Sequence, residues 1–495
     1  MISSEIFNFD NSYSRLPERF FASLPPLPVR DPKLVRLNSG LADQLCIDAK
    51  FLGKPEGLAI LAGNTIPKGA TPIAMAYAGF QFGHWVPQLG DGRAILLGEI
   101  IDSGGVRRDF QLKGSGPTPF SRMGDGRAAL GPVLREYICS EAMAALGIPT
   151  TRSLAAITTG EQVSRERILP GGILTRIARS HVRVGTFQYF AARNDMEALR
   201  LLADYVIERH YPELLSTENR YLGLLASVVK QQALLVSSWQ LVGFIHGVMN
   251  TDNMAISGET IDYGPCAFMD FFDPDIVYSS IDQMGRYCYK NQPHIAQWNL
   301  GGFAQTLLPL LSQDMDEAVE TATEVINTFE TLFQSFYYAG MRRKIGLSLE
   351  LDGDDNLVED LIKLMADYNM DFTLTFRYLC GLKNEKSLAD SVIYKLCSDQ
   401  SALDLWLLHW RARLAKENSL DTQRQNTMMQ VNPLFIPRNH LVERVVRAAE
   451  DDNNMTPFNE LVDVLARPYD GQSGYDDFAK TPRPEEIVKE TFCGT

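Results

Sequence analysis

The sequence predicts an α+β protein of two lobes, in which a strand-rich N-terminal lobe precedes a larger helical lobe. Short apolar runs bounded by Gly, Asp or Pro are typical of strands, and they occupy 94–101, 109–113, 153–159 and 172–178. From about residue 195 the apolar residues recur with the period of a helix, in 196–215, 222–248, 317–346, 358–368 and 404–416. This change of period separates the two lobes.

The expected organisation has four parts: an N-terminal extension (1–75), the N-terminal lobe (76–184), the C-terminal lobe (185–345) and a helical extension with a tail (346–495). The first part contains the Pro-rich stretch LPPLPVRDP (24–32), which predicts an extended arm. The tail (468–495) is rich in Gly, Pro and acidic residues, so we expect it to be loosely held.

One helix is expected within the strand-rich lobe, over 128–146. Its apolar residues fall on one helical face: Leu130, Val133, Leu134, Tyr137 and Ile138. Asp125 is the expected N-cap, and the stretch GIP (147–149) ends the helix.

The composition excludes several classes of protein. Among the 495 residues, 45% are hydrophobic and 22% charged, which is typical of a globular enzyme. The net charge of −14 argues against sequence-independent binding to nucleic acid or anionic lipid. Residues 1–15 lack the apolar core of a signal peptide, and no run is long and apolar enough to cross a bilayer. We therefore expect a cytoplasmic protein with no nucleic-acid or membrane partner.

The stretch HGVMNTDNM (246–254) has the spacing of a catalytic loop. Protein kinases carry H-x-D-x-x-x-x-N there; the Asp accepts the proton of the attacking hydroxyl and the Asn binds Mg²⁺. His246 and Asn253 keep this spacing, but Val248 replaces the Asp and cannot accept a proton. Asp252 lies directly before Asn253. The loop therefore resembles a kinase loop with its base moved, and His246 is expected to be structural.

The motif DYG (262–264) follows Asn253 by nine residues. Kinases place their DFG motif in this region, and its Asp binds Mg²⁺. We therefore predict that Asn253 and Asp262 are ligands of a divalent metal ion. Together with the two lobes, this order predicts a protein-kinase-like fold.

Two residues in the N-terminal lobe indicate phosphate binding. Lys113 ends an alternating strand, as the nucleotide-binding lysine of kinases does. A lysine at a strand end is more often solvated. Glu136, on the polar edge of the next predicted helix, is the expected partner that favours a binding site instead.

The pentapeptide GDGRA occurs twice, at 90–94 and 124–128. Glycine allows backbone N–H groups to approach an anion, and Arg offers planar donors suited to phosphate. The motif alone predicts only a turn; its positions before a strand and before a helix favour an anion site. Arg176 and Arg183 add basic groups near the junction of the lobes, with ordinary structural arginines as an equal alternative.

In combination, these segments resemble the selenoprotein O family (YdiU-like proteins). The resemblance rests on QLGDGRAILLGE, LKGSGPTPFSRMGDGRAALGPVLREYI, GGILTRIARSHVRVGTFQ, HGVMNTDNM and TIDYGPCAFMD, and it continues through NQPHIAQWNL and VNPLFIPRNH. It covers nearly the whole chain. It implies a kinase-like fold that binds ATP in a flipped orientation. The implied reaction transfers AMP to Ser, Thr or Tyr hydroxyls of proteins, the enzyme itself included, and releases pyrophosphate.

The resemblance also implies roles for individual residues. Asp252 is implied as the proton acceptor, and Lys113 as a phosphate ligand held by Glu136. Asn253 and Asp262 are implied ligands of Mg²⁺ or Mn²⁺. The residues implied to bind the nucleotide are Gly90, Gly92, Arg93, Lys113, Asp125, Gly126, Arg176, Arg183 and Asp262.

Three alternatives to AMP transfer stay open at this point. They are UMP transfer from UTP, transfer of the γ-phosphoryl group, and a scaffold that binds nucleotide without catalysis. Val248 argues against γ-phosphoryl transfer. The retained Asn253 and Asp262 argue against a scaffold, which needs no metal pair.

The seven cysteines form no CxxC motif, and no His lies near them at zinc spacing, so most are expected to be buried thiols. Cys493 is the exception. Some members of the family carry selenocysteine near the C-terminus, so Cys493 is a candidate for a regulatory disulfide with Cys266 or Cys288.

Overall fold

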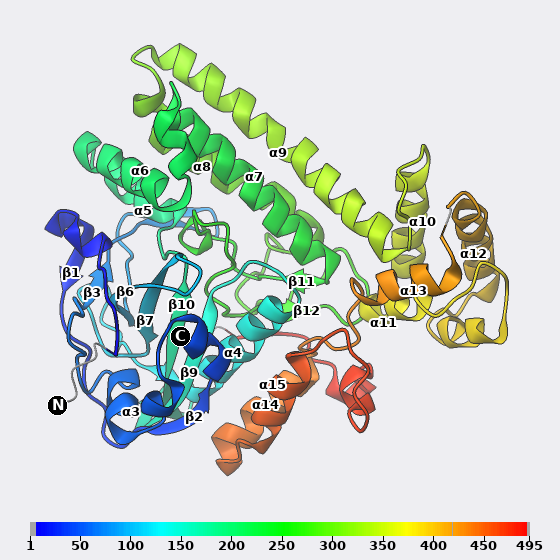
Figure 1. Ribbon diagram of the computed structural model, residues 1–495, viewed down its shortest axis with the longest axis horizontal. Helices are drawn as coiled ribbons and strands as arrows, with labels where there is room; N and C mark the ends of the chain where they lie inside the picture. Colours follow the sequence, from blue (N-terminus) through cyan, green and yellow to red (C-terminus); the bar gives the residue numbers. More distant parts are fainter. Residues whose placement is uncertain (1–5, 418, 493–495) are drawn as a thin grey trace.

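A computed structural model describes residues 6–417 and 419–492, so Cys493 lies outside the described residues. It confirms the α+β class (Figure 1). The main sheet has eight strands, and all its pairings are antiparallel. Its order is β1 (Phe21–Ser23), β3 (Ile73–Met75), β6 (Ala94–Ile101), β7 (Arg107–Lys113), β10 (Ile168–Ala178), β9 (Arg152–Ser164) and β2 (Lys33–Leu37), with β8 (Ala128–Ala129) beside β10.

The N-terminal residues are part of this sheet, so the expected arm does not stand apart from the fold, although residues 24–32 contain neither helix nor strand. They supply the strands β1 and β2 at the two ends of the strand order, together with the short helices α1 (Ser39–Gln44), α2 (Ala49–Leu52) and α3 (Pro55–Leu61). Apolar residues of these helices, such as Leu52 and Leu61, share a buried cluster with Phe110 and Leu112 of β7. Each segment is too short to show a period, and burial against the sheet stabilises it.

Helix α4 (Leu130–Ala145) confirms the helix expected in this region. Its predicted apolar face packs against α14 (Asn439–Asp452) and α15 (Thr456–Leu465), which lie beside it in Figure 1. The expected N-cap is wrong, because the cap position is Ala129. Asp125 instead accepts a hydrogen bond from the amide of Arg127 (2.9 Å) and pairs with Arg165 (2.9 Å).

The helical part of the chain forms two buried clusters. The first contains α5 (Val184–Ala191), α6 (Met196–His210), α7 (Arg220–Leu241), α8 (Gln292–Leu311) and part of α9 (Met315–Lys344). The second contains α10 (Asp354–Asp367), α11 (Phe372–Leu379), α12 (Gln400–Leu414) and α13 (Asp421–Met429), and α9 leads to it (Figure 1). Among the described helices, none combines the length and apolarity needed to span a bilayer.

The C-terminal tail is held more firmly than expected. The hydroxyl of Thr491 donates to the carbonyl of Pro265 (2.6 Å), and its amide donates to the carbonyl of Tyr278 (2.7 Å). The tail therefore crosses the segment that follows the DYG motif.

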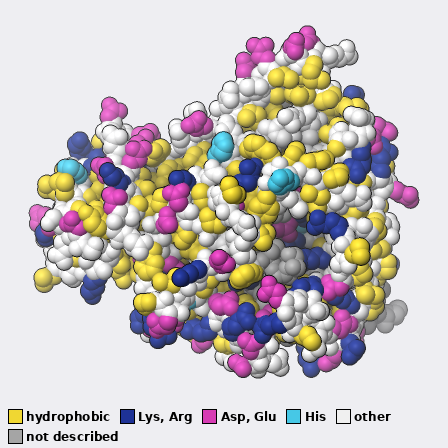
Figure 2. Space-filling model, turned by 180° about the vertical axis from the view of Figure 1, so that it is seen from behind, with side chains coloured by type: hydrophobic (Ala, Val, Ile, Leu, Met, Phe, Trp, Pro, Cys, Tyr) yellow, Lys and Arg dark blue, Asp and Glu magenta, His cyan; other side chains and the backbone are white. Residues whose placement is uncertain are grey.

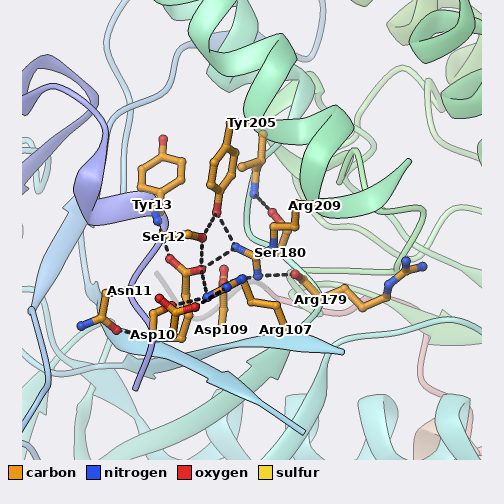
Figure 3. A network of polar contacts seen from close by, with 12 residues as sticks. Asp10, Asn11, Ser12, Tyr13, Arg107, Asp109, Arg179, Ser180, Tyr205 and Arg209 are labelled. Carbon is orange, nitrogen blue, oxygen red and sulfur yellow. Dashed lines mark hydrogen bonds and ion pairs between the residues drawn. The ribbon is translucent and has the colours of Figure 1, made fainter. Parts of the chain in front are cut away.

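A buried network of charged groups joins the sheet, the N-terminal segment and α6 (Figure 3). Arg209 of α6 donates to Glu99 of β6 (3.2 Å) and to Asp109 of β7 (2.6 Å). Glu99 also accepts from the amide of Tyr13 (2.5 Å). Burial raises the pKa of Asp109, but Arg209 and His181 outweigh it and hold this pKa well below its usual range. Asp109 is therefore ionised, whereas burial raises the pKa of Glu99 against the opposing effect of Arg209. Arg209 is the charge partner that the two carboxylates share.

Candidate active site

One part of the candidate site is an ion pair that joins the main sheet to α4. Lys113, the last residue of β7, lies 2.5 Å from the carboxylate of Glu136 on α4, and both side chains are buried. Arg176 of β10 also donates to Glu136. Burial and the nearby Arg176 lower the pKa of Lys113 to about 8, against the opposing effect of Glu136. The predicted pairing of Lys113 and Glu136 is present.

Asp262 lies between two arginines. Arg176 and Arg183 each donate to a different carboxylate oxygen of Asp262, both at 2.7 Å. Burial opposes ionisation, but the two arginines hold the pKa of Asp262 well below its usual range. Asp262 has a left-handed backbone (φ 58°), an uncommon conformation for a residue other than glycine that is often found at functional sites.

The loop 246–254 follows β11 (Phe244–Ile245), which pairs with β12 (Ala267–Phe268). His246 is buried and its Nε2 lies 2.8 Å from the carbonyl oxygen of Ile261, which fits the structural role predicted for it. Val248 is buried, and the Nδ2 of Asn253 donates to its carbonyl (3.0 Å). This bond leaves the Oδ1 of Asn253 available as an oxygen ligand.

Asp252 is 6% exposed, and its two oxygens differ. Oδ2 accepts a hydrogen bond from the Nε2 of Gln81 (3.0 Å), whereas Oδ1 is buried without a partner among the described residues. Burial raises the pKa of Asp252 to about 6, against the lowering effects of Gln81 and Arg183. A carboxylate with this pKa and a free oxygen is suited to accept a proton near neutral pH.

The two GDGRA turns lie against one loop. Phe120 fills the space beside Gly90, where a Cβ atom would come within 2.4 Å of its ring. The hydroxyl of Thr118 donates to the carbonyl of Asp91 (2.8 Å), which holds this loop on the first turn. In the second turn, a Cβ atom on Gly126 would lie 2.1 Å from the backbone of Gly116. Both turns therefore require glycine.

The predicted site residues fall into two groups. Contacts join Lys113, Glu136, Arg176, Arg183 and Asp262, and Arg183 also donates to the carbonyl of Asp252 (2.8 Å). Asp125 and Gly126 lie in the separate second turn, where Asp125 faces Arg165. The first turn is linked to the first group electrostatically, because Arg93 contributes to the lowered pKa of Lys113.

Comparison with known proteins gives the family. The family described as protein adenylyltransferase SelO matches residues 5–466. The chain belongs to this family. It is 60% identical to a protein nucleotidyltransferase YdiU of Bradyrhizobium diazoefficiens over 489 residues, 99% of each chain. It is 58% identical to the protein of the same name from Rhizobium meliloti, again over 99% of each chain. The chain is an enzyme of the nucleotidyltransferase class.

A nucleotidyltransferase needs charge compensation at the phosphates, and the site supplies donors for a divalent ion. Mg²⁺ in such sites takes one or two protein oxygens and completes its shell with water and substrate phosphates. The Oδ1 of Asn253 and the carboxylate of Asp262 match this requirement. No group of three or more His, Cys, Asp or Glu side chains suited to a metal occurs among the described residues. The described side chains therefore fit a metal ion that is bound jointly by the protein and the substrate. They do not fit a metal ion bound by protein ligands alone.

The sequence analysis missed two residues that line the candidate site. Asp91, inside the first GDGRA turn, is buried, accepts from the amide of Met75 (3.2 Å) and lies 3.7 Å from Arg183. Because Asp91 lies inside the first GDGRA motif, the sequence could have indicated it, but only the glycines and the arginine of this motif were assigned a role. Gln81 gave no signal, because only the fold brings β4 (Gly79–Gln81) against the loop 246–254.

Proposed function

We propose that this enzyme is a protein adenylyltransferase with a kinase-like, two-lobed arrangement around the site. The observation that supports this most is the state of Asp252. The kinase position for the base holds Val248. Asp252 has a pKa raised by burial to about 6 and a buried Oδ1 that has no partner within 6–417 and 419–492. The order of strand lysine, helix glutamate, catalytic loop and DYG motif supports the kinase-like arrangement.

The proposed reaction joins the acceptor oxygen to the α-phosphorus of ATP. The bond from the α-phosphorus to the oxygen that bridges to the β-phosphorus breaks, and pyrophosphate leaves with that electron pair. The hydroxyl proton of the Ser, Thr or Tyr acceptor goes to the Oδ1 of Asp252. This step needs no further reactant.

The basic groups of the site are suited to the leaving pyrophosphate. Lys113, Arg176 and Arg183 are buried, so their attraction to phosphate is weakly screened by water. Arg93 forms no ion pair among the described residues and is available to the nucleotide. Mg²⁺ or Mn²⁺ held by Asn253 and Asp262 would neutralise phosphate charge. A flipped ATP would place β- and γ-phosphates at these donors and the α-phosphate near Asp252.

The names of the relatives also allow UMP transfer, since they specify a nucleotidyltransferase without the nucleotide. Transfer of the γ-phosphoryl group is less favoured because of Val248. A non-catalytic scaffold is less favoured because it has no need of a base such as Asp252.

The experiment that tests the proposal uses ATP labelled at either the α- or the γ-phosphorus. The enzyme is incubated with Mg²⁺ and an acceptor protein, with chelator and the Asp252→Asn variant as controls. We expect α-label on protein, absent with chelator and strongly reduced in the variant. Protein-bound γ-label would replace the proposal with a kinase activity.

The rate of transfer is expected to fall as the pH falls through about 6, because Asp252 then gains a proton. Gln81 donates to the ionised form and so lowers this pKa. Replacing Gln81 with Leu should raise the pKa further and move the acid limb of the kcat profile to higher pH. An acid limb that stays at the same pH in Gln81→Leu would contradict the role of Asp252.

Gly79 gives a second prediction. A Cβ atom there would lie 2.9 Å from the Oδ1 of Asp252. Gly79→Ala should therefore displace the base and lower kcat by about 10- to 100-fold, since a small misplacement is costly. ATP affinity, measured by calorimetry, should stay unchanged. Gly301→Ala on α8 is the control, because its Cβ meets nothing within 4 Å. Equal kcat in both variants would rule out this steric account.

A further inference from the structure

A hairpin made of β4 and β5 (His84–Val86) is fixed to the loop that carries Asp252. The amide of Phe80 donates to the hydroxyl of Thr251 (2.7 Å), and the amide of Phe82 donates to the Oδ1 of Asn250 (3.0 Å). Phe82 and Gly83 both have positive φ angles, 51° and 84°, as a tight two-residue hairpin turn requires. The hairpin is therefore a rigid element within one hydrogen bond of the base.

This hairpin presents aromatic rings to solvent together with α8. The ring of Phe80 lies 5.0 Å from Trp85 and 5.3 Å from Trp298 of α8. Trp85 is 37% and Trp298 40% exposed, a large fraction for tryptophan. The guanidinium of Arg286 lies 4.8 Å from the centre of the Trp298 ring. We call these four residues, Phe80, Trp85, Arg286 and Trp298, the aromatic–arginine surface.

Arg286 has no acidic partner. Among the described residues no carboxylate forms an ion pair with it, and its Nε is buried without a hydrogen bond. The nearby Asp282 is occupied, because its oxygens accept from the amides of Arg286 (2.9 Å) and Tyr287 (2.8 Å). The chain has a net charge of −14, and most of its arginines form ion pairs. The half-buried guanidinium of Arg286 lies among aromatic rings instead, and its planar donors are suited to bind a carboxylate.

Figure 2 shows the face of the molecule opposite to that of Figure 1, on which side chains of both charges are present. There, Lys and Arg side chains alternate with Asp and Glu side chains, and hydrophobic side chains lie between them (Figure 2).

We propose that the aromatic–arginine surface docks the acceptor segment of the protein substrate, and that this segment carries a carboxylate near its acceptor hydroxyl. The proposal rests on the proposed function. Trp and Arg are the residue types that most often dominate binding energy at interfaces. Strand β5 pairs only with β4 among the described strands, so its outer edge can add an extended segment. An extended acceptor on this edge reaches the loop of Asp252, because the hairpin is bonded to Asn250, Thr251 and Asp252.

The test uses peptides with a fixed Ser, Thr or Tyr in which each flanking position is varied in turn, with α-labelled ATP. We expect the wild-type enzyme to prefer Asp or Glu at one flanking position, with KM about tenfold lower than for Lys there. Arg286→Glu should reverse this preference, so that the peptide with Lys becomes the better acceptor. Trp298→Ala should raise KM for all peptides and leave ATP affinity unchanged.

Lys363→Glu on α10, at the far end of the molecule in Figure 1, makes the same charge change and should leave the acidic preference unchanged. Melting temperatures identify a variant that fails to fold, and Arg286→Gln then replaces Arg286→Glu, with loss of the preference as the expected result. If the wild-type enzyme transfers AMP without an acidic preference, or if the preference survives both Arg286 variants, only the docking inference is overturned. If the wild-type enzyme transfers no nucleotide, the proposed function falls and the docking inference with it.

Discussion

Replacing Asp262 with Asn is expected to reduce nucleotide transfer by about 1,000-fold or more, because charge stabilisation is the largest contribution in such sites. The substitution keeps the shape of the side chain and removes its charge. It also places an amide where Arg176 and Arg183 each donate at 2.7 Å, so the two arginines lose their shared partner. Transfer from α-labelled ATP measures the loss.

Asp354→Asn is the matched control for this variant. Asp354 on α10 is a buried carboxylate that pairs with Arg413 (2.5 and 3.0 Å), remote from the site in sequence and in Figure 1. Both variants should lose stability, but only Asp262→Asn should lose transfer at a temperature where each is folded. Wild-type transfer by folded Asp262→Asn would contradict the role given to Asp262.

Replacing Arg209 with Met is expected to destabilise the protein by about 3 to 5 kcal/mol, the usual effect of removing one partner of a buried ion pair. Arg209 is the charge partner of both Glu99 and Asp109 in the network of Figure 3. As ion-pair partners, Glu99 would keep only Arg107 at 3.4 Å, and Asp109 would keep only His181 among the described residues. Denaturation by urea, followed by circular dichroism, measures the change in unfolding midpoint.

Arg200→Met, on an exposed position of the same helix, is the control and should change stability by well under about 1 kcal/mol. Equal midpoints for Arg209→Met and the wild-type protein would show that the network contributes little. Glu99, which pairs with Arg209, also accepts from the amide of Tyr13 in the N-terminal segment. Limited proteolysis of Arg209→Met should therefore cut first in this region.

Some contacts of the candidate site could be predicted from sequence because its residues lie in short motifs with fixed spacing, whereas their chemical roles stay predictions. Lys113 at a strand end and Glu136 on the next helix were expected to pair, and they do. The positions of Asn253 and Asp262 relative to His246 predict a catalytic loop with a metal pair, and these roles stay predictions. Spacing of this kind depends on local structure, which sequence specifies well.

Features that depend on tertiary contact could not be predicted. The Pro-rich stretch 24–32 predicts an extended arm, and the strands and helices on either side of it are too short to show a period. Their apolar residues are buried against the sheet. Asp125 has the residue type of an N-cap. However, its turn packs closely on the backbone of Gly116 at Gly126, and Asp125 pairs with Arg165 instead of capping the helix. The contact of Gln81 with Asp252 spans 171 positions in the chain, and no local pattern indicates it.

The measurement that tests the central claim most directly is the intact mass of an acceptor protein after incubation with the enzyme, Mg²⁺ and an equal mixture of ATP and UTP. We expect a mass increase equal to one AMP group on Ser, Thr or Tyr, with pyrophosphate in solution. An increase equal to UMP would show that UTP is the substrate, and the proposed nucleotidyl transfer to a hydroxyl would still hold. An increase equal to a phosphoryl group, or none while nucleotide is bound, would contradict AMP transfer.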